Sequence, residues 1–172
     1  MPSWLTTMLS VIAGGMLTMV SAWLADRRLA HRDRERRSEE RHERVVMRRN
    51  DFQRETLLAL QVTSQKLLRK TGEMLQLDIV AHRTSGKWQK QLLPDGIASD
   101  HLHLTTETML LASRVRDDEV RTLADQFRSE AAIVGQSQDE HEAENRMMVA
   151  ANRQQALIQR IGLLVRELDK IG

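Results

Sequence analysis

An uninterrupted apolar run opens the chain. Trp4 to Ala25 is 22 residues without a charged side chain. As a helix this run is about 33 Å long, which matches a bilayer hydrocarbon core of about 30 Å. Trp4 and Trp23 lie near its two ends, where aromatic side chains favour the membrane interfaces. The pattern predicts a transmembrane anchor over residues 1–25.

Two other structures contain a similar apolar run: a buried helix of a soluble core and a cleaved signal peptide. A core of this size has little need of so many consecutive uncharged residues. A signal peptide would have a basic residue before the run and small residues at the cleavage site, where Trp23 stands. We therefore interpret the run as an uncleaved anchor.

Small side chains recur every four residues within this run, at Ser10, Gly14, Thr18 and Ala22. The spacing places them on one stripe of a helix, where a second membrane helix could approach closely. The stripe predicts an association surface, and with it a homo-oligomer formed through the anchor.

Charged side chains replace the apolar ones directly after Ala25. Residues 26–50 hold ten Arg and six acidic residues. Arginine clusters beside a membrane helix stay in the cytoplasm, so the domain that follows is expected there. Arg27, Arg28 and Arg32 are expected at the membrane interface, where they could contact anionic lipid. Nucleic acid is not expected, because acidic residues interleave with the arginines.

The segment 26–44 has no face to bury, since Leu29 and Ala30 are its only apolar residues. It predicts an exposed helical stalk, supported by ion pairs four residues apart such as Glu40 with Arg44.

From residue 45 onward, apolar residues recur at steps of three and four, which predicts helices with one buried face. The first such helix is expected to end near Gly86, before a turn at Pro94-Asp95-Gly96. A middle segment of about 100–135 starts at a Ser99 or Asp100 cap and contains Asp117-Asp118, which marks a kink or a new cap. The last helix is expected over about 139–170.

The fold class is therefore all-α: a transmembrane helix continues into a long helix that packs in an antiparallel three-helix bundle over residues 45–172. The expected inward residues of the middle segment are Leu102, Met109, Leu110, Val115, Val120, Leu123, Ala124, Phe127, Ala131 and Val134. Composition agrees, because there is no Cys, aromatic residues make up 3%, and neither disulfides nor a sheet is indicated.

Candidate chemistry is sparse. His101 and His103 lie two residues apart beside Asp100, whereas metal ligands on one helix face are spaced four apart. Ser99, Asp100 and His101 include the residue types of a hydrolytic triad, but their adjacency fits a helix start better. No glycine-rich phosphate loop is present in the sequence. We expect no catalytic, metal or cofactor site, and no enzyme.

One loop could carry recognition. Trp88, Leu92 and Leu93 lie between the first helix and the Pro94 turn. They are expected either to pack over the distal end of the bundle or to form a docking tip for a protein partner.

The chain resembles a recurrent set of uncharacterised actinobacterial single-pass membrane proteins. The resemblance is carried by WLTTMLSVIAGGMLTMVSAWLADRR, ERRSEERHE, TLLALQVTSQKLLRKTG, GKWQKQLLP and LLASRVRDDEVRTLADQF. It implies an anchor, an Arg/Glu-rich stalk and a cytoplasmic helical domain, and it implies no activity. A looser similarity is to the membrane-anchored b subunit of rotary ATP synthases, from which the turn at Pro94 and the returning helices depart.

These observations favour a single-pass protein of the cell membrane whose cytoplasmic helices serve as an interaction module, a scaffold or adaptor. Its expected partners are the lipid bilayer, a protein of unknown identity and further copies of itself. The alternative is a phage-type holin or another membrane-remodelling protein that acts through oligomers of the anchor.

Overall fold

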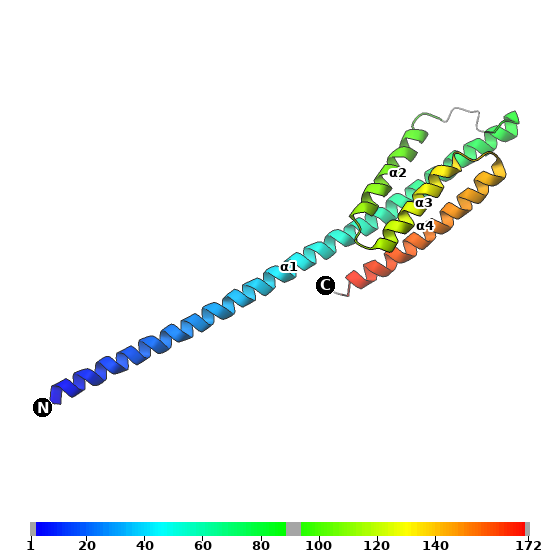
Figure 1. Cartoon of the computed structure of the whole chain (residues 1–172). Helices are drawn as coiled ribbons and strands as arrows, with labels where there is room; N and C mark the ends of the chain where they lie inside the picture. The colour runs from blue at the N-terminus through cyan, green and yellow to red at the C-terminus, as the bar shows by residue number, and fades with distance from the viewer. Residues whose placement is uncertain (1–2, 89–93, 171–172) are drawn as a thin grey trace. The chain divides into compact units, whose positions relative to one another are not determined.

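The computed structural model describes the backbone of residues 3–88 and 94–170, and the side chains of residues 40–88 and 94–170. Four α-helices account for most of these residues: α1 (Ser3–Ser85), α2 (Ile97–Arg114), α3 (Asp118–Val134) and α4 (Glu140–Leu168) (Figure 1). No strand occurs in the described backbone. The all-α prediction is therefore confirmed.

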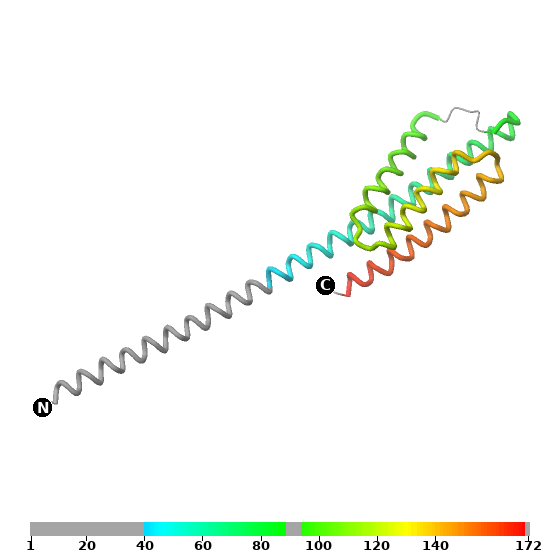
Figure 2. The backbone as a smooth tube through the Cα atoms, in the orientation of Figure 1, coloured from blue at the N-terminus to red at the C-terminus, as the bar shows by residue number. Residues whose placement is uncertain are grey.

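The chain divides into two compact units, Met1–Arg48 and Arg49–Gly172, and α1 contributes to both. The predicted anchor, residues 1–25, and most of the predicted stalk lie outside the residues whose side chains are described, which Figure 2 draws in colour. Within the described part of the first unit, the Arg44 guanidinium lies 3.9 Å from the Glu40 carboxylate and donates to its backbone carbonyl.

Over residues 40–88 and 94–170, no helix is long and apolar enough to cross a membrane.

The second unit is a four-helix bundle in which successive helices run in alternating directions (Figure 1). The prediction of three helices was wrong in the middle segment, which is two helices. Val115 and Asp117 adopt extended backbone conformations, and the Asp117 carboxylate accepts a hydrogen bond from the Val120 amide at 2.8 Å. Of the two readings of Asp117-Asp118, the new cap is confirmed. The extended residues before it reverse the chain, so that α2 and α3 lie antiparallel.

The inward positions of these helices advance by three and four residues, the pattern of left-handed helix packing. On α1 they include Gln53, Leu57, Leu60, Ser64, Leu67 and Thr71, and on α4 they include Ala143, Ala150, Gln154, Leu157 and Ile161. Phe127 on α3 is the largest fully buried side chain. Because many inward residues are Ala, Ser or Thr, much of the core consists of small side chains between a few large ones.

Glycines end α1 and precede α2. Gly86 has φ of 66° and donates its amide to the His82 carbonyl, so α1 ends close to the predicted place. Gly96 has φ of 90°, and the Ile97 amide donates to the Pro94 carbonyl in the predicted turn. The prediction that Ser99 or Asp100 caps α2 was wrong. The helix already begins at Ile97, without a side-chain cap.

Candidate functional site

Helix α2 exposes several of its large apolar side chains. Its buried residues are Thr108 and Ala112. Leu102, in contrast, is 68% exposed, and Met109 and Leu110 are about half exposed. The predicted inward face of this helix was therefore wrong except at Val115, which is 2% exposed. The side of α2 that faces the bundle contains His101, Leu104, Thr108 and Leu111. Because His101 and Thr108 are polar, the spacing of apolar residues does not reveal this side.

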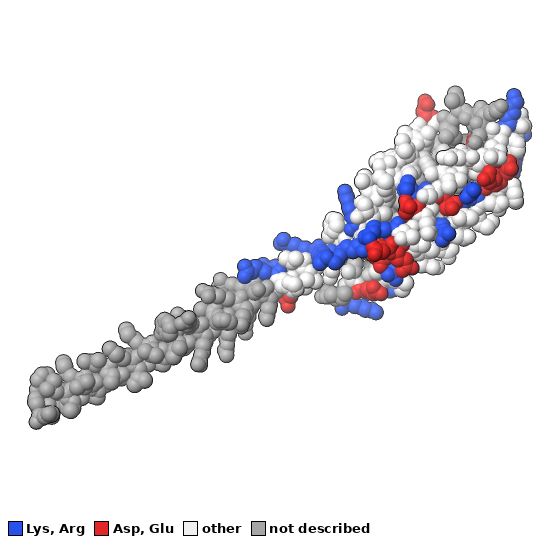
Figure 3. Space-filling view, viewed as in Figure 1, with Lys and Arg blue, Asp and Glu red and all other residues white. Residues whose placement is uncertain are grey.

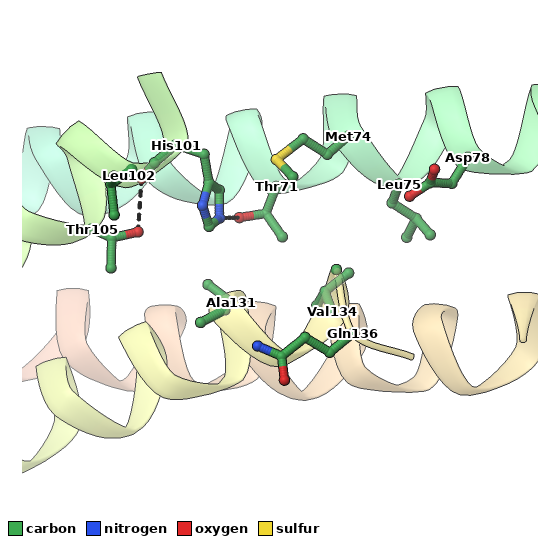
Figure 4. A pocket seen from close by; sticks show the side chains of 12 residues that line it. Thr71, Met74, Leu75, Asp78, His101, Leu102, Thr105, Ala131, Val134 and Gln136 are labelled. Atoms are coloured by element: carbon green, nitrogen blue, oxygen red, sulfur yellow. Dashed lines mark hydrogen bonds between the residues drawn. The ribbon is translucent and has the colours of Figure 1, made fainter. Parts of the chain in front are cut away.

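A pocket of about 270 Å³ lies where the beginning of α2 faces α1 and the end of α3 (Figure 4). Its walls combine aliphatic side chains with a few polar ones. The lining residues are Thr71, Met74, Leu75, Asp78, His101, Leu102, Thr105, Ala131, Ala132, Val134, Gly135 and Gln136. Alanine and glycine on the α3 side leave the space that larger residues would fill.

His101 is held at one end of this pocket by a hydrogen bond to Thr71, with 3.2 Å between Nε2 and the hydroxyl oxygen (Figure 4). The Thr71 hydroxyl donates its single hydrogen to the Leu67 carbonyl at 2.9 Å. His101 Nε2 must therefore carry the proton and donate, which leaves Nδ1 with its lone pair. Burial lowers the pKa of His101 below 6.5, so the imidazole is neutral at pH 7.

The neighbours of His101 in sequence point elsewhere. His103 is exposed and lines a separate depression with Lys66, Arg69 and Lys70. The Asp100 carboxylate lies 3.5 Å from the Lys70 ammonium, and the Ser99 hydroxyl donates to the Gly96 carbonyl. Ser99, Asp100 and His101 thus have separate partners and form no triad. Within the described residues, no group of three or more metal-binding side chains comes together.

A second polar site fixes the turn between α2 and α3 to α1. The Gln53 side chain is 8% exposed; its amide nitrogen donates to the Arg114 carbonyl at 3.0 Å, and its amide oxygen accepts from the Arg116 amide at 2.9 Å. One side chain therefore pairs with two backbone groups of a turn that is more than 60 residues away in sequence. Gln53 is not among the predicted site residues, because a glutamine in a helix belongs to no sequence pattern that reveals a distant backbone partner.

Asp117 in the same turn also binds α4. The Arg160 guanidinium donates to its carboxylate at 2.6 Å, and Arg160 lies 3.0 Å from Glu119 as well. The hydrogen bond from Arg160, with the capping bond from Val120, holds the pKa of Asp117 below its usual value of 3.8. The pKa of Arg160 is raised by the same pairing. The turn between α2 and α3 is thus bound by Gln53 of α1 and by Arg160 of α4.

Trp88 lies over the opposite end of the bundle. It is half-buried against the second hydrophobic cluster of Leu75, Ile79, Val134 and Ala143. Its indole nitrogen donates to the Ser137 carbonyl at 2.9 Å. Its ring meets the His82 imidazole edge to face, with 5.5 Å between the centroids. These contacts agree with packing over the bundle end, whereas Leu92 and Leu93 lie outside the described residues.

Glu140, at the start of α4, ties that helix to the end of α1. Arg83 donates to one carboxylate oxygen at 3.0 Å, and His82 Nδ1 lies 3.2 Å from the other. These hydrogen bonds, the one from Arg83 above all, lower the pKa of the Glu140 carboxyl.

The remaining predicted site residues lie outside the described side chains. They are the interface residues Trp4, Trp23, Arg27, Arg28 and Arg32, and the association stripe Ser10, Gly14, Thr18 and Ala22. In the described part, Lys and Arg side chains gather over α1 where the coloured surface begins, whereas acidic and basic side chains mix over the bundle (Figure 3).

No protein-family model, curated protein or solved structure matches this chain. The resemblance to actinobacterial membrane proteins therefore stays a prediction.

Proposed function

We propose that the protein is a membrane-tethered interaction module without catalytic activity, a scaffold or adaptor whose cytoplasmic bundle binds a helix of a partner protein. The observation that carries the proposal is the exposure of Leu102, Met109 and Leu110 on α2. A helix that buries threonine and alanine while it exposes leucine and methionine leaves apolar area for another molecule.

The spacing on this outer surface suits a helix as the partner. Ala98, Leu102, Thr105 and Met109 follow one another at steps of four, three and four, the pattern that a facing helix engages. Ala98, Leu102 and Met109 are exposed, and Thr105 is half-buried. We call these four residues the α2 outer face.

The proposed tether rests on the sequence of the first 25 residues and on the arginines that follow them. A cytoplasm-specific fluorescent reporter fused after Gly172 should be bright, because the arginine cluster retains the domain on that side. A dark fusion, together with an active periplasmic reporter at the same position, would reverse the orientation.

Site-directed photocrosslinking followed by purification from solubilised membranes tests the docking function. A crosslinker at Met109 should capture one defined protein, and Leu102→Ser in the same chain should abolish that adduct. The matched control on α4 places the crosslinker at Met148, 62% exposed, and pairs it with Leu163→Ser, 48% exposed. Adducts that form equally from α2 and α4 would contradict a specific docking face.

A further inference from the structure

The polar side chains around the pocket between α1, α2 and α3 offer hydrogen-bond acceptors and few hydrogen-bond donors. The Thr71 hydroxyl hydrogen goes to the Leu67 carbonyl, and the Thr105 hydroxyl hydrogen goes to the His101 carbonyl at 2.7 Å. The proton on His101 Nε2 goes to Thr71, as shown above. Both hydroxyl oxygens and the imidazole Nδ1 therefore offer lone pairs. Among the side chains that line the pocket, Gln136 alone brings donors of its own.

Asp78 is the one acidic side chain among the residues that line the pocket. Asp78 and His101 are the ionisable groups among its lining residues, and His101 is neutral. Asp78 already has a partner in the structure, and a carboxylate has about four lone-pair positions, so it can accept from a further donor. Asp78 lies seven residues beyond Thr71, which is about 10 Å along α1. Figure 4 shows Asp78 at one end of the group of lining side chains and Leu102 and Thr105 at the other, with His101 and Thr71 between them.

Aliphatic side chains line the wall between these ends. Met74 and Leu75 come from α1, and Ala131 and Val134 come from α3. The volume of about 270 Å³ is below the range of about 300–1,000 Å³ that is usual for drug-sized ligands. A suitable ligand is therefore small, with a slim apolar body and a donor-rich cationic head.

We infer that this pocket binds an alkylammonium group, with the ammonium at Asp78 and the alkyl chain against Leu75, Met74 and Val134. An ammonium supplies three donors and no acceptor, which complements the Asp78 carboxylate. The group could belong to a free small amine or to a lysine side chain of the docking partner. The lysine alternative rests on the proposed docking function, whereas the free amine does not.

Methyl NMR titration of the full chain in a non-ionic detergent tests this inference, with the Met74 methyl group in the pocket wall as the probe. Pentylammonium should shift this signal saturably. 1-Pentanol, which has the same chain without the charge, should bind roughly tenfold more weakly or worse, since its hydroxyl donor to the Asp78 carboxylate carries no positive charge. Equal affinities for the two compounds would overturn the inference.

Two pairs of variants locate the binding. Asp78→Asn should weaken pentylammonium binding roughly tenfold or more. Asp51 is an exposed carboxylate on the same helix, and Asp51→Asn should leave the binding unchanged. Ala132→Leu should fill the pocket and block binding with Asp78 intact. Its control is Ala156→Leu, a half-buried alanine of α4 that does not line the pocket. Unaltered binding in both Asp78→Asn and Ala132→Leu would overturn the assignment.

A third ligand distinguishes the two sources. Lysine whose α-amino and α-carboxyl groups are blocked as amides presents the same ammonium group as a lysine side chain in a peptide. If it binds as tightly as pentylammonium, the site accepts a lysine side chain. If it is rejected while pentylammonium binds, the site takes a free amine. If neither compound shifts the Met74 signal, the inference is wrong.

Discussion

Helices α2 and α3 are nearly equal in length, at 18 and 17 residues, yet they contribute differently to the bundle. α3 begins with a side-chain cap and buries Val120, Ala124, Phe127, Ala131 and Val134. α2 begins at Ile97, after Gly96, without such a cap and buries only Thr108 and Ala112. The contrast shows that an amphipathic helix need not turn its apolar residues toward the core of its own bundle. α3 stabilises the unit, whereas α2 presents Leu102, Met109 and Leu110 to solvent.

The largest expected difference between the two helices is in the effect of removing a large side chain. Phe127→Ala should lower the free energy of unfolding by about 3–5 kcal/mol, because Phe127 is fully buried. Met109→Ala on α2 should change it by about 0.5 kcal/mol or less, because Met109 is 48% exposed. Chemical denaturation of the full chain in mild detergent measures both. Similar losses would remove the distinction between the helices.

The attachment of the turn between α2 and α3 should be the next most sensitive feature. Gln53→Ala leaves the Arg116 amide and the Arg114 carbonyl without their partner and should cost about 1–3 kcal/mol. The same denaturation experiment measures this loss. Gln76→Ala, an exposed glutamine on the same helix, is the control and should be near neutral. A neutral Gln53→Ala would mean that water replaces both bonds at no cost.

The cap of α3 should contribute a smaller and pH-dependent amount. Asp117→Ala should cost about 1 kcal/mol through loss of the cap. Since folding lowers the pKa of Asp117, its ionised form stabilises the folded state above pH 3.8, and this contribution is lost as the pH falls through the lower folded-state pKa. Asp117→Asn keeps a capping oxygen but should remove this pH dependence, which thermal unfolding between pH 2 and pH 5 would measure.

The smallest expected effect concerns His101 at the start of α2. Burial lowers its pKa, so the unfolded chain binds a proton more readily than the folded one. Stability should be unaffected above pH 6.5 and should decline as the pH falls from there through the lower folded-state pKa. Amide exchange along the first half of α2 should accelerate over the same range. His101→Gln should abolish this pH dependence, and its persistence in that variant would assign it to another group.

The sequence predicted those parts of the fold in which apolar residues coincide with the helical period. Leu57, Leu60 and Leu67 on α1 and Leu157 and Ile161 on α4 lie on the apolar steps of three and four residues, and all five are buried. The ends of these helices were also predicted closely, because Gly86 and Asp139 have local preferences that a single sequence reveals.

The same reasoning failed where polar residues occupy inward positions. His101 and Thr108 lie in the inward stripe of α2, while Leu102 and Met109 lie outside it, so an assignment by apolarity selects the wrong face. The separation of α2 from α3 could be anticipated only as one of two readings of Asp117-Asp118. The bonds of Gln53 to a distant turn and the acceptor-rich pocket depend on tertiary geometry, which leaves no local trace in sequence.

The attachment of Gln53 to the turn also has a consequence for the time course of synthesis. Gln53 and Arg114 are 61 residues apart, so the inward face of α1 leaves the ribosome well before the turn that it holds. At about 5–20 residues per second, this delay is roughly 3–12 s. For that interval Leu57, Leu60 and Leu67 have no bundle to enter, although each is fully buried in the finished protein. A nascent chain arrested before Arg114 should therefore bind chaperones through this face and should lose them once α4 has been made.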